Sequence, residues 1–238
     1  MKLIIAWIVA FIVAKAPPGR PQYIPEARET IEEATARYES IAHDIAEVVY
    51  DSSEAPLFRG PDGRARTAAV IQSVMLYESG FRKDVDLGQG RQSKGDGGRS
   101  WCMLQIQLGQ ARANGRTQQR IILQPDGMYH FAHDGLTGIG GEDLVRDRKI
   151  CIRAGLHMMR KSFTSCTRGP VEHRLSLYAS GECDRGQAES AKRMSSALRW
   201  FQSHKPEFTD AEILRGPSPS PEPDDQPVTL SLTLSLND

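Results

Sequence analysis

The stretch AVIQSVMLYESGF, residues 69–81, decides how the rest of the chain can be interpreted. Ile71 and Met75 recur at helical spacing and predict a helix with an apolar face toward the core. Glu78 falls on that face, and Gly80 is the residue type that ends a helix in the left-handed conformation. Apolar surroundings disfavour an ionised carboxyl group, so they raise its pKa toward the range of a general acid. The alternative is a solvated glutamate in the last turn of an ordinary helix.

Two later segments carry polar residues in unusual settings. GDGGRS, residues 95–100, is a glycine-rich turn whose backbone can approach a ligand closely, and it leads into WCMLQIQLG. Gln105 lies inside that apolar run, so its amide needs a hydrogen-bond partner. In SLYASGECDRG, residues 176–186, small residues follow Tyr178 and would allow close backbone approach around its hydroxyl. Each segment alone is a weak indication.

In this order and at this spacing, the segments resemble the lytic transglycosylase and goose-type lysozyme group of peptidoglycan-cleaving enzymes. ESGF at 78–81 is similar to the catalytic glutamate motif of that group, and CMLQI at 102–106 is similar to its GLMQI. CIRAG at 151–155 is similar to NIRAG, and LYASG at 177–181 is similar to AYNAG. The resemblance covers roughly residues 64–202.

The resemblance implies an all-α fold, with a compact lysozyme-like helical domain at residues 64–205 and Glu78 as its one catalytic acid. It also implies substrate contacts from Ser79, Ser100, Met103, Gln105 and Tyr178. The expected partner is the glycan strand of peptidoglycan, and neither a cofactor nor a metal ion is expected. Nucleic acid is not an expected partner, because thirty acidic and thirty basic residues leave no positive excess.

Three functions are open at this point, of which the first is the preferred prediction and the second is the runner-up. A lytic transglycosylase takes its nucleophile from the 6-hydroxyl of the muramic acid residue and leaves a 1,6-anhydro end. A lysozyme-type hydrolase needs a second carboxylate. The candidates for it are Asp96 and Asp86, with Asp84 beside them, although none falls in a matched motif. A noncatalytic glycan-binding protein is the third, and Ala179 in place of the AYNAG asparagine agrees with it mildly.

The N-terminus argues for export. A lysine precedes an apolar run from Leu3 to Ala14, which has signal-peptide length and is shorter than the roughly 20 residues that cross a bilayer. The run ends in a small-residue AKA sequence, but Pro17 follows and is expected to hinder cleavage. We therefore expect residues 1–16 to be a signal peptide or a membrane tether through residues 3–14, on a periplasmic or secreted protein. A buried N-terminal helix is the alternative.

Four cysteines in an exported chain predict two disulfides, for which three pairings are open; free buried thiols are the alternative. No CxxC pair is present, and the spacings fit no common zinc site. Cys102 and Cys151 occupy positions where the family motifs have Gly and Asn. The resemblance therefore implies that these two pair with each other, which leaves Cys166 to pair with Cys183.

The remaining segments complete the expected organisation, in which residues 17–63 form a linker and an N-terminal helix. Apolar periodicity predicts helices from Glu26 to about Tyr50, from Asp143 to about Ser165 and from Glu189 to His204. Residues 110–141 form a long Gly-rich and Gln-rich loop containing His130 and His133, which is either a lid over the glycan groove or an insertion. Residues 216–238 form a Pro-rich linker and a β-prone tail of unassigned role.

Overall fold

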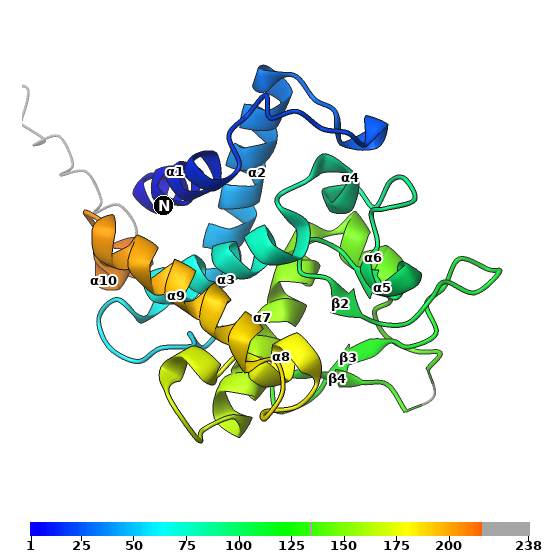
Figure 1. Ribbon diagram of the computed structural model, residues 1–238. Coiled ribbons are helices and arrows are strands. Elements are labelled where there is room, and N and C mark those ends of the chain that lie inside the picture. Colours follow the sequence, from blue (N-terminus) through cyan, green and yellow to red (C-terminus); the bar gives the residue numbers. More distant parts are fainter. Residues whose placement is uncertain (134, 216–238) are drawn as a thin grey trace, which may run out of the picture.

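Helix α3 (Gly63–Ser79), which carries Glu78, lies at the centre of the molecule in the computed structural model, which describes residues 1–133 and 135–215 (Figure 1). The other long helices are α1 (Lys2–Lys15), α2 (Ile31–Tyr50), α7 (Arg148–Ser165) and α9 (Gln187–Ser203). The short ones are α4 (Lys83–Asp86), α5 (Gly95–Gly98), α6 (Gly141–Arg146), α8 (Ser176–Ser180) and α10 (Asp210–Arg215), with 3₁₀ turns η1 (Pro25–Ala27) and η2 (Val171–His173). The chain is thus mainly α-helical, as predicted.

Helix α3 is buried more completely than its sequence predicts. Ile71 and Met75 are fully buried, as expected for the apolar face, but Thr67, Gln72 and Ser73 are buried as well. Helices α1, α2 and α9 all pack on α3, so more than one of its faces is covered (Figure 1). Gly80 ends the helix with φ 60°, in the left-handed conformation that was predicted.

Two small antiparallel hairpins lie on one side of the helices (Figure 1). In the first, β1 (Ser100–Trp101) pairs with β2 (Ile106–Gln107). In the second, β3 (Ile121–Leu123) pairs with β4 (Tyr129–Phe131), with Ile122 opposite His130. The second hairpin falls inside the segment predicted to be a long loop, so that segment has more regular structure than its composition indicates.

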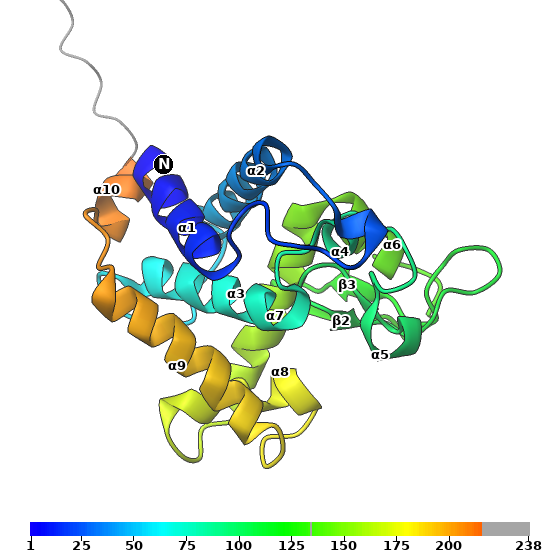
Figure 2. The same cartoon turned by 45° about the horizontal axis from the view of Figure 1, so that its top comes forward.

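The apolar N-terminal run forms α1, which lies beside α2 and over α3 (Figure 2). Its Ile4, Ile8, Phe11 and Ile12 are fully buried in the core. The Phe11 ring meets the Phe81 and Trp200 rings edge-on, at centroid distances of 6.5 and 5.2 Å. This arrangement corresponds to the alternative of a buried N-terminal helix, and a tether through residues 3–14 would require α1 to leave the core. Among the described residues, no helix combines the length and apolar character that crossing a bilayer takes.

Both predicted disulfides are present. Cys102–Cys151 joins the loop after β1 to α7, and Cys166–Cys183 joins the end of α7 to the segment after α8. Disulfides are typical of extracellular and periplasmic proteins, so the chain fits an oxidising environment. The Pro-rich linker and tail predicted at 216–238 lie outside the described residues.

Candidate active site

A cleft of about 1230 Å³ runs past the C-terminal end of α3. Glu78 contributes to one wall, together with Gly95, Asp96 and other residues of the glycine-rich segment. The β3–β4 hairpin and the loops at its ends form another wall, which includes Tyr129 and His133. Side chains of α7 and residues 177–181 complete the lining. The predicted loop at 110–141 therefore takes part in the cleft.

The cleft brings together several side chains predicted from different motifs. Its lining includes Glu78, Asp96, Ser100, Gln105 and Tyr178. The CIRAG segment packs closely on the CMLQI segment: a Cβ atom built on Gly155 would lie 2.3 Å from Leu104 Cδ1, so the glycine leaves room for this leucine as it lies. The matched segments are thus neighbours in space.

Glu78 sits at the cleft with its side chain 19% exposed. Burial raises the pKa of its carboxyl group, and the negative charge of Asp96 acts in the same direction. Arg193 opposes both, because its Nη2 donates a hydrogen bond to Glu78 Oε1 at 2.7 Å. Burial has the largest effect, so the pKa of Glu78 lies above its ordinary value, as the sequence predicts.

The glycine-rich segment is held in shape by Gln105. Its Oε1 accepts a hydrogen bond from the Gly95 N–H at 2.7 Å, and its Nε2 donates to the Cys102 carbonyl at 2.9 Å. Asp96 accepts a hydrogen bond from Ser100 Oγ at 2.6 Å. Both Gln105 and Asp96 have positive φ, of 49° and 51°. The Gln105 amide is therefore satisfied by backbone groups of its own loop. The same loop places the Asp96 carboxylate at the cleft.

Tyr178, like Gln105, holds a backbone segment of the cleft in position. Its hydroxyl donates a hydrogen bond to the Leu104 carbonyl at 2.5 Å. Burial, and then the nearby charge of Glu78, raise the pKa of this hydroxyl well above its ordinary value. It therefore stays protonated and holds the CMLQI backbone in place.

The structure places two predicted substrate-binding residues elsewhere. Ser79 is buried, and its Oγ donates to the Met75 carbonyl at 2.8 Å, so it stabilises the end of α3. Met103 is 1% exposed and belongs to the hydrophobic core. Neither is part of the cleft lining. Neighbouring helix and turn positions point in different directions. Ser79 and Met103 therefore do not share the surface of Glu78 and Gln105, although they lie close to them in the sequence.

Two of the three candidate second carboxylates also lie outside the lining. Asp86 is buried and accepts hydrogen bonds from Arg148 Nε and Nη2 at 2.9 and 3.0 Å. Asp84 is fully buried and pairs with Arg82. The Asp86 pair holds α4 against α7, whereas the Asp84 pair is local to the start of α4. Asp96 alone among the three faces the cleft.

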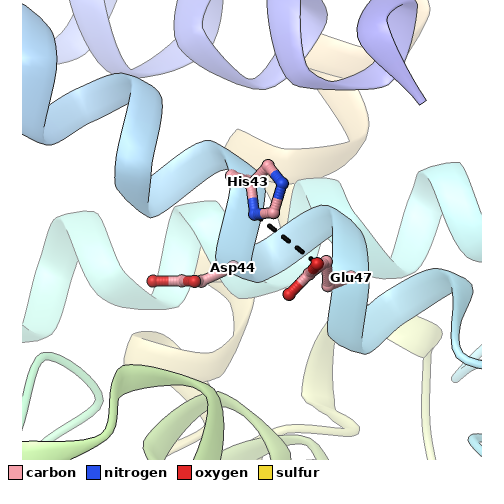
Figure 3. A group of neighbouring side chains, drawn as sticks. All are labelled: His43, Asp44 and Glu47. Atoms are coloured by element: carbon pink, nitrogen blue, oxygen red, sulfur yellow. Dashed lines mark ion pairs between the residues drawn. The ribbon is translucent and has the colours of Figure 1, made fainter.

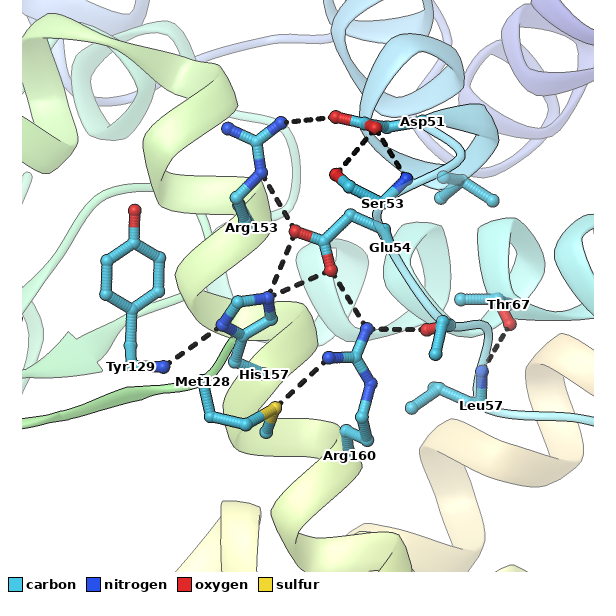
Figure 4. Close-up of polar contacts among 12 residues, drawn as sticks. Asp51, Ser53, Glu54, Leu57, Thr67, Met128, Tyr129, Arg153, His157 and Arg160 are labelled. Atoms are coloured by element: carbon cyan, nitrogen blue, oxygen red, sulfur yellow. Dashed lines mark hydrogen bonds and ion pairs between the residues drawn. The ribbon is translucent and has the colours of Figure 1, made fainter. Parts of the chain in front are cut away.

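A buried polar cluster behind the hairpin was not predicted (Figure 4). Glu54, 7% exposed, is within 2.9 to 3.0 Å of His157 Nε2, Arg153 Nε and Arg160 Nη2, all on α7. His157 Nδ1 accepts the Tyr129 N–H at 3.1 Å, so its Nε2 proton points to Glu54. His157 and Tyr129 also line the cleft. The cluster therefore fixes the cleft wall formed by the hairpin.

This cluster predicts a pH-dependent contribution to stability. Burial alone would raise the pKa of Glu54, but the hydrogen bonds from His157 and Arg160, together with charge attraction, outweigh burial and lower that pKa. The unfolded carboxyl titrates near pH 4.3, so the contribution is present above that pH and is lost as pH falls through the lower pKa of the folded state. We expect Glu54→Gln to lower the free energy of unfolding by about 1–3 kcal/mol at pH 7, and by less at pH 3. Urea unfolding from pH 7 to pH 3 measures this difference.

The matched control is Glu182→Gln, which removes an exposed carboxylate whose one ion pair among residues 1–133 and 135–215 is with Arg185. Its unfolding curve should follow the wild type at every pH. A Glu54→Gln deficit of constant size from pH 7 to pH 3 would contradict the ionised pairing of Glu54.

One group of potential metal ligands occurs within the described residues, on α2: His43, Asp44 and Glu47 (Figure 3). Asp44 pairs with Arg148, and Glu47 lies 3.2 Å from Lys149 Nζ. These cations already neutralise the carboxylates, and none of the three residues lines the cleft. The group is therefore explained by ion pairing on the helix surface.

No family model, curated protein or solved structure matches this chain. Function is therefore inferred from the cleft and its residues.

Proposed function

We propose that this protein is a peptidoglycan lytic transglycosylase, which cleaves the β-1,4 bond between N-acetylmuramic acid and N-acetylglucosamine. The observation that supports this most directly is Glu78: a largely buried carboxyl group with a raised pKa, at the side of an open cleft. A glycan strand needs an open cleft because it extends past the bond being cut. The association of the ESGF, CMLQI and LYASG segments around this cleft agrees with the resemblance.

In the proposed mechanism Glu78 acts twice. As a neutral acid it transfers its proton to the glycosidic oxygen, and the bond from that oxygen to the muramic C1 breaks as oxocarbenium character develops there. As the resulting carboxylate it accepts the proton of the muramic 6-hydroxyl, whose oxygen forms a bond to C1. The nucleophile and C1 belong to the same sugar, so no water is consumed and the product ends in 1,6-anhydromuramic acid.

A lysozyme-type hydrolase is the second candidate, because Asp96 lines the same cleft and its charge acts on Glu78. A second carboxylate in a glycosidase either forms a covalent intermediate or activates water. Asp96 already accepts a hydrogen bond from Ser100, which gives it a role in holding the loop. The lyase therefore remains the preferred proposal.

Analysis of the products and of Asp96→Asn together separates the two candidates. We expect purified protein to release muropeptides with anhydro ends, which are lighter than the hydrolysis products by one water. Asp96→Asn should retain activity within about tenfold of wild type, less than the 10²-fold or greater loss typical of removing a group that transfers a proton. Mass spectrometry of the soluble products and their rate of release measure both. Reducing ends in the wild-type products, with loss of activity in Asp96→Asn, would instead identify a hydrolase.

A further inference from the structure

Arg193 is the one residue whose side chain donates a hydrogen bond to the Glu78 carboxylate, within the part of the chain that the structure describes. It lies on α9, and its side chain is 12% exposed. The Ser73 hydroxyl of α3 donates to the Arg193 carbonyl at 2.8 Å, so the Arg193 backbone is fixed to the helix that carries Glu78. The Arg193 guanidinium therefore contacts the Glu78 carboxylate from a backbone position that is fixed relative to α3.

The geometry of the pair is not that of a simple bridge between helices. One nitrogen, Nη2, contacts one oxygen, Oε1, whereas an arginine that only joins two elements commonly uses both nitrogens of its fork. The Nε of Arg193 is buried and has no hydrogen-bond partner among the described residues. Burial of an unpaired donor costs stability. Stability alone therefore does not account for the arrangement.

We propose that Arg193 is a positioning residue for Glu78: it occupies one carboxylate oxygen, so the transferable proton resides on the other. A protonated Oε1 would direct its O–H toward a cation that has only donors to offer. The second oxygen, Oε2, receives no hydrogen bond from the described residues and is the one left to meet the glycosidic oxygen. This inference rests on the proposed function for its catalytic meaning.

The same contact adjusts the balance between the two roles of Glu78. The charged or titratable groups that act with Glu78 are Arg193 from α9, Asp96 from the glycine-rich segment and Tyr178 from α8. Burial and Asp96 favour the neutral acid, and Arg193 favours the carboxylate that remains after proton transfer. Arg193 therefore keeps the carboxyl group from becoming too weak an acid to release its proton.

The test is direct titration of Glu78 by carboxyl ¹³C NMR in the protein without substrate. Arg193→Met removes the charge, and the titration midpoint should rise by about 1 to 2 pH units. Arg193→Lys keeps the charge and should return the midpoint to within about 0.5 unit of wild type. In activity assays the alkaline decline of kcat/KM should shift to higher pH in Arg193→Met and return in Arg193→Lys.

The matched control is Lys192→Met on the same helix, since Lys192 Nζ lies over the Tyr77 ring and makes no ion pair with Glu78. Its midpoint should equal that of wild type. If Arg193→Met does not fold, Arg193→Gln removes the same charge and should raise the midpoint as well. An unchanged midpoint in a folded neutral variant would overturn the positioning role while leaving the proposed function standing. An active Glu78→Gln variant would remove the proposed function without affecting the titration result.

Discussion

Replacing Glu78 with glutamine is expected to reduce peptidoglycan cleavage by about 10²- to 10⁴-fold, the usual contribution of general acid catalysis. The amide has nearly the same size and can still accept the Arg193 hydrogen bond, but it has no proton to give to the glycosidic oxygen and cannot serve as the base. Folding should be preserved, because Glu78 makes one ion pair within the described part of the chain and is not part of the hydrophobic core. Release of soluble muropeptides from purified peptidoglycan measures the effect.

Glu182→Gln provides the control for this variant. Glu182 is an exposed carboxylate directly after the LYASG segment and pairs with Arg185, so its loss should leave the rate unchanged. Activity of Glu78→Gln within about tenfold of wild type would exclude Glu78 as the acid. Binding of peptidoglycan without turnover, in both wild type and Glu78→Gln, would favour the noncatalytic glycan-binding alternative.

Short-range features of the site could be predicted from the sequence. The end of α3 follows from apolar spacing and from Gly80, and the raised pKa of Glu78 follows from its position on the buried face. Asp96 could be named as a candidate because it lies in the turn that leads into CMLQI. These inferences use contacts between residues close in the chain, where helix and turn geometry determines direction.

Long-range partners could not be predicted in this way. Arg193 lies 115 residues after Glu78, and His157 lies 103 residues after Glu54. Neither pair has a sequence motif, because an arginine or a histidine in a helix usually faces solvent or completes a local ion pair. The disulfides are the exception. The family resemblance predicted that Cys102 and Cys151 pair with each other, and the structure contains this disulfide.

The N-terminal run shows a different limit, since an apolar segment of this length has the same composition whether it directs export or packs in a core. In the structure its buried residues repeat at helical spacing, at Ile4, Ile8, Phe11 and Ile12, whereas Leu3 is 57% exposed. Such one-sided burial is what packing of one face of the helix on α2 and α3 requires. The mean apolarity of the run does not show which side of the helix is buried.

Phe11→Ala is accordingly expected to lower the free energy of unfolding by about 3–5 kcal/mol, the usual cost of removing a fully buried phenylalanine ring. The ring fills the space between Phe81, which directly follows Glu78, Ser79 and Gly80, and Trp200 on α9. A cavity there loosens the contact between the end of α3 and the helix that carries Arg193. Urea unfolding of protein whose mass confirms that residues 1–16 are retained measures the change.

Leu3→Ala on the same helix is the matched control, and it should change the free energy of unfolding by less than about 0.5 kcal/mol, since its side chain is exposed. If Phe11→Ala unfolds at the same urea concentration as Leu3→Ala, α1 does not belong to the core. The interpretation of residues 1–16 as an export segment or tether would then be preferred. If only Phe11→Ala is destabilised, the helix is part of the fold that supports Glu78, and removal of residues 1–16 should weaken catalysis together with stability.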